Sequence, residues 1–171
     1  MDTSIHSVPL TEIYFDPFRT TNRAVRLSDA APDLIHQLRD AFPPIYSPIF
    51  ESAAAADDWL DSNDLIVGYA DGNAAFAYPV RILNFHEIIS HEVNGRAVMA
   101  TYCPLCRSGI VYDRTVNGEM LLFGNTSALY ESDMVMLDHQ TGSYWMQVSG
   151  EAIVGTLTGT RLTSLPARTP L

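Results

Sequence analysis

After Asp64 the chain is divided by turns that end in glycine, and this pattern constrains the fold more than any other feature of the sequence. The turns are Asp71-Gly72, Asn94-Gly95, Asn117-Gly118 and Thr141-Gly142, and strand-like segments flank each of them. Asn-Gly and Asp-Gly supply the positive φ angles that two-residue hairpin turns require. The pattern predicts antiparallel hairpins that pair 65–70 with 74–80, 86–93 with 96–102, 110–116 with 119–123, and 134–139 with 143–148.

Helical signals lie mainly in the N-terminal part. Apolar residues at helical spacing between 28 and 42 follow a capping Ser28 or Asp29, and Pro43-Pro44 ends the segment. A second, Ala-rich helix is expected at about 52–60, and one helical turn at 85–89 interrupts the strands. The sequence therefore predicts a β-rich α+β fold, a meander of antiparallel hairpins with two short N-terminal helices.

Length and composition favour a single domain over 1–171, of which 47% is hydrophobic. Within it we expect an N-terminal arm (1–28), a helical region (29–63) and a β-rich core (64–165) that carries the Cys and His motifs. No stretch approaches the roughly 18 apolar residues of a membrane span, and no signal sequence opens the chain. We expect a soluble protein, either cytoplasmic or exported with a signal sequence absent from this chain.

The charge excludes several classes of function. The formal net charge is −10 at pH 7, and all 10 basic residues are Arg, scattered along the chain. A nucleic-acid binder would carry a basic patch, so no nucleic-acid partner is expected. The chain offers no Lys for Schiff-base chemistry and no Gly-rich loop for a nucleotide or flavin. The sequence is compatible with a homo-oligomer and leaves any small-molecule substrate unidentified.

Cys103-Pro104-Leu105-Cys106 is the most informative motif. Two thiols at this spacing on a turn can bind one tetrahedral metal ion. The chain has only these 2 cysteines, so a metal would need a histidine, a carboxylate, a second subunit or open positions. A redox disulfide is a second interpretation, but 108–112 reads as a strand rather than the helix that such a pair requires. Two buried, inert cysteines are the third.

His86 is the expected partner of these thiols. If 86–93 pairs with the strand that leads to Cys103, the register places His86 roughly opposite Cys103. The alternative is a histidine that is hydrogen-bonded in a half-buried turn. His139 precedes the Thr141-Gly142 turn and is expected to be solvated. Acidic and amide residues at strand ends form a further polar set that includes Ser132-Asp133 and Gln147.

Long segments of the chain resemble the uncharacterised prokaryotic family catalogued as domain of unknown function 3179. They are 78–88, 101–106, 108–114, 123–130, 132–136, 140–143 and 150–155. The resemblance covers about 29–165 and implies membership of that family, with no established activity attached to it. The family's His-Glu and Cys-Pro motifs fall on His86-Glu87 and on Cys103, with Cys106 beside it.

The sequence leaves three hypotheses for function. The first is a metal-binding β-rich domain with Cys103, Cys106 and His86 as ligands for zinc, or for copper in a reducing setting. The second is a metal-free thiol enzyme in which His86 deprotonates Cys103, oriented by Glu87 or Asp113. The third is a non-catalytic structural or interaction domain with inert cysteines.

Overall fold

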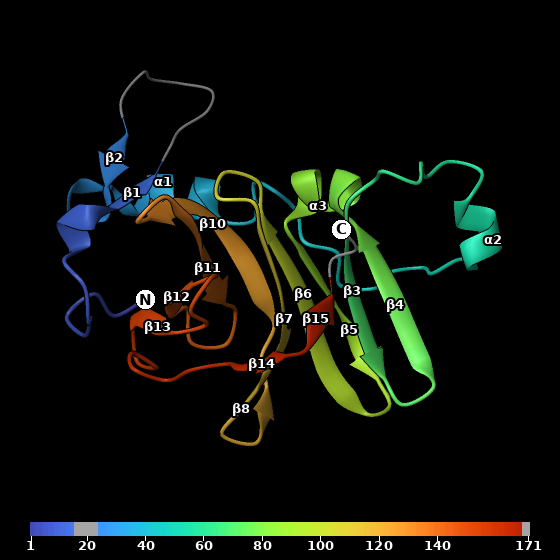
Figure 1. Cartoon of the computed structure of the whole chain (residues 1–171). Coiled ribbons are helices and arrows are strands. Elements are labelled where there is room, and N and C mark those ends of the chain that lie inside the picture. The colour runs from blue at the N-terminus through green and yellow to red at the C-terminus, as the bar shows by residue number, and fades with distance from the viewer. Residues whose placement is uncertain (16–23, 169–171) are drawn as a thin grey trace.

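The computed structural model describes residues 1–15 and 24–168, whose strands pair antiparallel in four sheets (Figure 1). The largest, sheet A, has the order β13-β12-β11-β10-β1-β2. Its strands are β1 (Ile13–Phe15), β2 (Val25–Arg26), β10 (Phe123–Tyr130), β11 (Asp133–Asp138), β12 (Tyr144–Met146) and β13 (Ala152–Val154). Strands β10 to β13 follow one another as a meander, and the N-terminal strands β1 and β2 extend the sheet beyond β10.

The other three sheets are smaller. Sheet B has the order β14-β7-β6-β5, sheet C the order β15-β3-β4, and β8 pairs with β9 alone. Their strands are β3 (Ile66–Asp71), β4 (Ala74–Pro79), β5 (Ile88–Val93), β6 (Arg96–Cys103), β7 (Ser108–Asp113), β8 (Thr115–Val116), β9 (Glu119–Met120), β14 (Thr163–Leu165) and β15 (Ala167–Arg168). The predicted β-rich α+β fold is therefore confirmed, and hairpins cross each of the four predicted turns.

The helices are short. They are α1 (Pro32–Leu38), α2 (Ala53–Ala56) and α3 (Val80–His86), with 3-10 turns η1 (Leu10–Glu12) and η2 (Leu27–Asp29). The two expected N-terminal helices are present as α1 and α2, but both are shorter than expected. Ser28 and Asp29 belong to η2 rather than to a cap, because the chain is extended at Ala30 and Ala31 before Pro32 starts α1. The expected helical turn at 85–89 is instead the end of α3. No helix in the described part of the chain is long and apolar enough to span a membrane.

The sheets and the N-terminal elements stack in layers (Figure 1). Between sheets A and B lies an apolar cluster that includes Ile88, Met99, Tyr112, Phe123, Met136 and Trp145. A second cluster joins the other face of sheet B to sheet C and α3, and a third joins the other face of sheet A to η2 and α1. Both A and B are thus covered on two faces, which explains why β6 is buried from Ala97 to Cys103 and β11 along its whole length.

The contact between sheets B and C depends on a small residue. A Cβ atom added to Gly109 on β7 would lie 2.6 Å from Cγ2 of the buried Val67 on β3. We expect Gly109→Ala to lower the free energy of unfolding by about 1–3 kcal/mol, because the sheets must move apart to admit the methyl group. Chemical denaturation measures the change.

A double-mutant cycle with Val67→Ala tests the cause. Removing the Val67 methyl groups makes room for the new Cβ, so Gly109→Ala is expected to cost less in the Val67→Ala background than in the wild type. An equal cost in both backgrounds would show that the clash with Val67 is not the reason.

Candidate metal centre

The two cysteines lie on the tight connection between β6 and β7. Cys103 ends β6, and the chain returns to β7 at Ser108. The amide of Arg107 donates to the carbonyl of Cys103 at 2.8 Å, and Arg107 takes a positive φ of 56° to close the turn. The amide of Cys106 then points at Sγ of Cys103, 3.5 Å away. The local sequence therefore holds both thiols on one turn, as the Cys-Pro-Leu-Cys spacing predicts.

Asp133, the first residue of β11, completes a group of three potential ligands. One ligand atom from each of Cys103, Cys106 and Asp133 lies within 4.8 Å of the other two. The Cys106 thiol donates to Oδ1 of Asp133 at 3.1 Å, and the amide of Val148 donates to Oδ2 at 2.7 Å. Because Val148 holds Oδ2, Oδ1 is the carboxylate oxygen turned toward the thiol. Cys103 and Asp133 are buried, whereas Cys106 is exposed, so the group opens to solvent on the Cys106 side.

A buried polar chain supports the exposed thiol. Sγ of Cys106 lies 3.0 Å from Oγ of Ser108, which donates to Oε1 of Gln147 at 2.7 Å. The amide nitrogen of Gln147 donates to Oγ1 of Thr101 at 2.8 Å. Gln147 and Thr101 are fully buried. The Ser108 proton is directed to Gln147 and the Cys106 proton to Asp133, so the short contact between them sets the sulfur of Cys106 beside a hydroxyl that Gln147 holds in place.

Burial controls the protonation of the inner cysteine. Removal from water raises the pKa of the Cys103 thiol to about 12, so at neutral pH it keeps its proton when no cation is near. A bound metal ion replaces such a proton outright, because coordination stabilises the thiolate. Cys103 is therefore suited to ligate a metal ion and poorly suited to act as a free nucleophile.

His86 does not lie in this group. The expected register between β5 and β6 is present, with Ile88 opposite Thr101, but the strand begins only at Ile88. His86 still belongs to α3, and Glu87 follows it with a positive φ of 58°, so the alternation of a strand does not extend to the imidazole. Nδ1 of His86 lies 2.7 Å from the carbonyl oxygen of Pro43. The structure brings the two cysteines together with Asp133 instead.

Glu87, the second residue of the His-Glu motif, is turned inward. The side-chain amide of Asn125 donates to Oε2 of Glu87 and also lies 3.5 Å from the sulfur of Met134. Asn125 sits beside a bulge in β10, where Ser127 has a positive φ of 57°. Burial raises the pKa of Glu87 to about 7, and the hydrogen bond from Asn125 opposes that rise.

His139, expected to be solvated, has three polar partners. Its Nε2 lies 3.1 Å from Oδ2 of Asp40 and 3.1 Å from the hydroxyl of Tyr46, and its Nδ1 lies 3.0 Å from Nη2 of Arg39. The partners come from the segment after α1, about 100 residues earlier in the chain. Local sequence around the turn carries no sign of such a distant contact.

Asp133 is the candidate ligand that the sequence did not select. It stood among several polar residues at strand ends, and nothing in its own segment distinguished it from Asp138, which is also buried. Asp138 accepts hydrogen bonds from the indole of Trp145 and from Thr141, so its carboxylate is occupied by its own hairpin. The packing of sheet A against sheet B is what places the carboxylate of Asp133, and not that of Asp138, beside the cysteines.

The fold and this centre define a β-rich α+β protein with a cysteine pair and a carboxylate where two sheets meet. A family model described as Protein of unknown function (DUF3179) matches residues 39–170, and the chain belongs to this family. The match includes every strand from β3 to β15, the two cysteines and Asp133, whereas β1 and β2 of sheet A precede it. No curated protein and no solved structure matches the chain.

The inward position of Glu87 makes stability depend on pH. Its pKa is about 7 in the folded protein, compared with 4.5 for the unperturbed group, so the folded state binds this proton more tightly. The resulting stabilisation is fully present below about pH 4.5 and is lost as the pH rises through about 7. Relative to Glu87→Gln, we expect the wild-type free energy of unfolding to fall by roughly 1–3 kcal/mol across that interval.

Denaturant unfolding at several pH values measures this difference. Glu119→Gln makes the same chemical change on the exposed strand β9, and we expect its difference from the wild type to stay constant with pH. If the difference in free energy of unfolding between the wild type and Glu87→Gln also stays constant with pH, Glu87 is not the group that binds a proton more tightly in the folded state.

Proposed function

We propose that this protein binds a zinc ion through Cys103, Cys106 and Asp133. The observation that carries the proposal is the convergence of two sulfur atoms and one carboxylate oxygen within 4.8 Å of one another. The three groups come from two different sheets. Cys103 ends β6 of sheet B and Cys106 lies in the turn after it, whereas Asp133 starts β11 of sheet A. Sulfur and carboxylate oxygen are both common ligands of zinc.

The mixture of ligands favours zinc over copper. Thiolates alone would suit Cu(I), which prefers soft ligands, but the hard carboxylate of Asp133 is poorly matched to it. Zn²⁺ accepts sulfur and oxygen in one tetrahedral site. Two thiolates and one carboxylate carry three negative charges, so the ion would also relieve repulsion among its own ligands.

Three protein ligands leave the fourth tetrahedral position for water or a small-molecule substrate. Zinc sites with three protein ligands and an open position are typical of catalysis, whereas closed four-ligand sites are structural. Cys106 lies on the solvent side, so the open position would be reached from there. His86 does not belong to this group of three, and its Nδ1 lies against the Pro43 carbonyl.

The thiol-enzyme hypothesis receives less support from the same geometry. A nucleophilic cysteine needs a lowered pKa and a base within hydrogen-bond reach. Burial raises the pKa of Cys103 to about 12, and the proposed base His86 does not belong to the group of potential ligands around Cys103. A bound zinc ion would supply a positive charge beside the Cys103 sulfur and so stabilise its thiolate form.

Elemental analysis of protein purified from unsupplemented medium tests the proposal. We expect roughly one zinc ion per chain in the wild type and almost none in Cys103→Ser or Cys106→Ser, because a serine hydroxyl is a poor zinc ligand. Asp133→Asn is expected to weaken zinc binding by about tenfold or more in competition with a chelator, since the amide brings no charge.

Matched controls separate coordination from general damage. Glu131→Gln removes one carboxylate from the turn just before Asp133, and His139→Ala removes a histidine from another cluster; both are expected to keep zinc. His86→Ala is expected to keep it as well. The proposal fails if the wild type binds no zinc on titration, or if the Cys103→Ser protein binds it as tightly as the wild type.

A further inference from the structure

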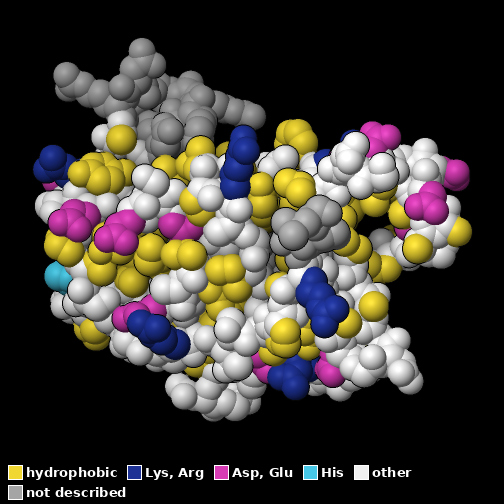
Figure 2. Space-filling view, in the orientation of Figure 1, with side chains coloured by type: hydrophobic (Ala, Val, Ile, Leu, Met, Phe, Trp, Pro, Cys, Tyr) yellow, Lys and Arg dark blue, Asp and Glu magenta, His cyan; other side chains and the backbone are white. Residues whose placement is uncertain are grey.

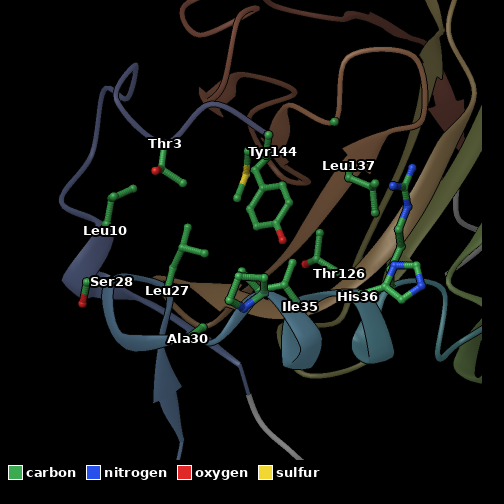
Figure 3. Close-up of a pocket in the computed structure, with 14 residues that line it drawn as sticks. Thr3, Leu10, Leu27, Ser28, Ala30, Ile35, His36, Thr126, Leu137 and Tyr144 are labelled. Atoms are coloured by element: carbon green, nitrogen blue, oxygen red, sulfur yellow. The ribbon is translucent and has the colours of Figure 1, made fainter.

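A cavity lies on the face of sheet A that is turned away from sheet B. It encloses about 490 Å³ between the N-terminal elements and strands β11 and β12 (Figure 3). The apolar part of its walls includes Leu10, Leu27, Ala30, Ile35 and Leu137. A volume of this size is typical of sites for small molecules, which range from roughly 300 to 1,000 Å³.

The hydroxyl of Tyr144 is directed into this cavity without a partner. Tyr144 is only 4% exposed, and Figure 3 shows its ring reaching across the cavity toward Thr126. None of the described residues forms a hydrogen bond with this hydroxyl, and burial raises its pKa. The hydroxyl of Thr126 is bonded elsewhere, since it donates to the carbonyl of Val135 and accepts from the amide of Ala128. The hydroxyl is therefore free to donate to a molecule that occupies the cavity.

A cation lines the same cavity. Arg39 is exposed and lines the cavity with Tyr144, and its charge opposes the rise in the pKa of Tyr144 that burial causes. Within the described residues no carboxylate pairs with Arg39; one of its nitrogens lies 3.0 Å from Nδ1 of His139. The adjacent carboxylate, that of Asp40, is held by the ring of His139 and by the amide of Asn125. The guanidinium therefore keeps donors available for a ligand.

We propose that this cavity binds a small monocarboxylate with an apolar body. The carboxylate would accept a hydrogen bond from Tyr144 and pair with Arg39, and the apolar body would lie against Leu27, Ile35 and Leu137. Arginine is suited to this role, because its planar group matches the two oxygens of a carboxylate. The class follows from the guanidinium of Arg39, the free hydroxyl of Tyr144 and the apolar side chains beside them, in a cavity that Met1 and His36 also line. This inference does not depend on the zinc proposal.

Calorimetric titration with octanoate tests the site. We expect saturable binding that Tyr144→Phe and Arg39→Gln each weaken by about tenfold or more, because each removes a bond to a charged ligand. 1-Octanol has the same tail without the charge and is expected to bind at least about tenfold more weakly than octanoate. Tyr144→Phe loses no hydrogen bond within the protein, so its melting temperature is expected to match or exceed that of the wild type.

Control variants repeat the same substitutions elsewhere. Tyr69→Phe alters a tyrosine of sheet C, and Arg96→Gln alters an arginine of sheet B; neither residue lines the cavity. Both are expected to bind octanoate as the wild type does. The proposal is overturned if neither octanoate nor benzoate binds saturably, if Tyr144→Phe and Arg39→Gln bind like the wild type, or if 1-octanol binds as tightly as octanoate.

Discussion

The face-to-face packing of sheets A and B is the contact on which the rest of the structure depends. Each sheet is covered on its second face as well, A by η2 and α1 and B by sheet C. Side chains from the two sheets meet in one cluster, and on the sheet A side of it the rings of Phe123 and Trp145 contact edge to face with centroids 5.4 Å apart. Close packing of this kind transmits small displacements, so it also fixes the distance between the edges of the two sheets.

The candidate metal centre lies where those edges meet. Cys103 is the last residue of β6 in sheet B and Cys106 lies in the turn after it, whereas Asp133 opens β11 in sheet A. A metal ion held by all three would link the sheets directly, in addition to the chain Ser108–Gln147–Thr101 that already crosses between them. The arrangement of the ligands is therefore a property of the packing of the two sheets, and only the spacing of the cysteines is local.

This difference explains how far the sequence could predict the structure. Local signals located the hairpins, the two N-terminal helices and the cysteine turn, since each depends on neighbouring residues. Asp133 is 27 residues from Cys106, and alternation along β11 carries no information because every residue of that strand is buried. The register that suggested His86 was right at Ile88 but did not extend to the imidazole, because α3 ends there with a left-handed residue.

Scattered arginines, expected from the sequence, also lie apart on the face shown in Figure 2.

Strand β12 connects the two proposed sites. Tyr144 faces the cavity, Trp145 faces the cluster between the sheets, and Gln147 just beyond the strand supports Cys106 through Ser108. Asp133 accepts from the amide of Val148, so a shift of this segment would move a carboxylate ligand and the support of a thiol together. The indole of Trp145 is hydrogen-bonded to Asp138 at 3.0 Å and is fully buried, which resists such a shift. The two sites therefore share one strand, in which the buried Trp145 lies between the tyrosine that faces the cavity and the segment that contacts Asp133 and Ser108.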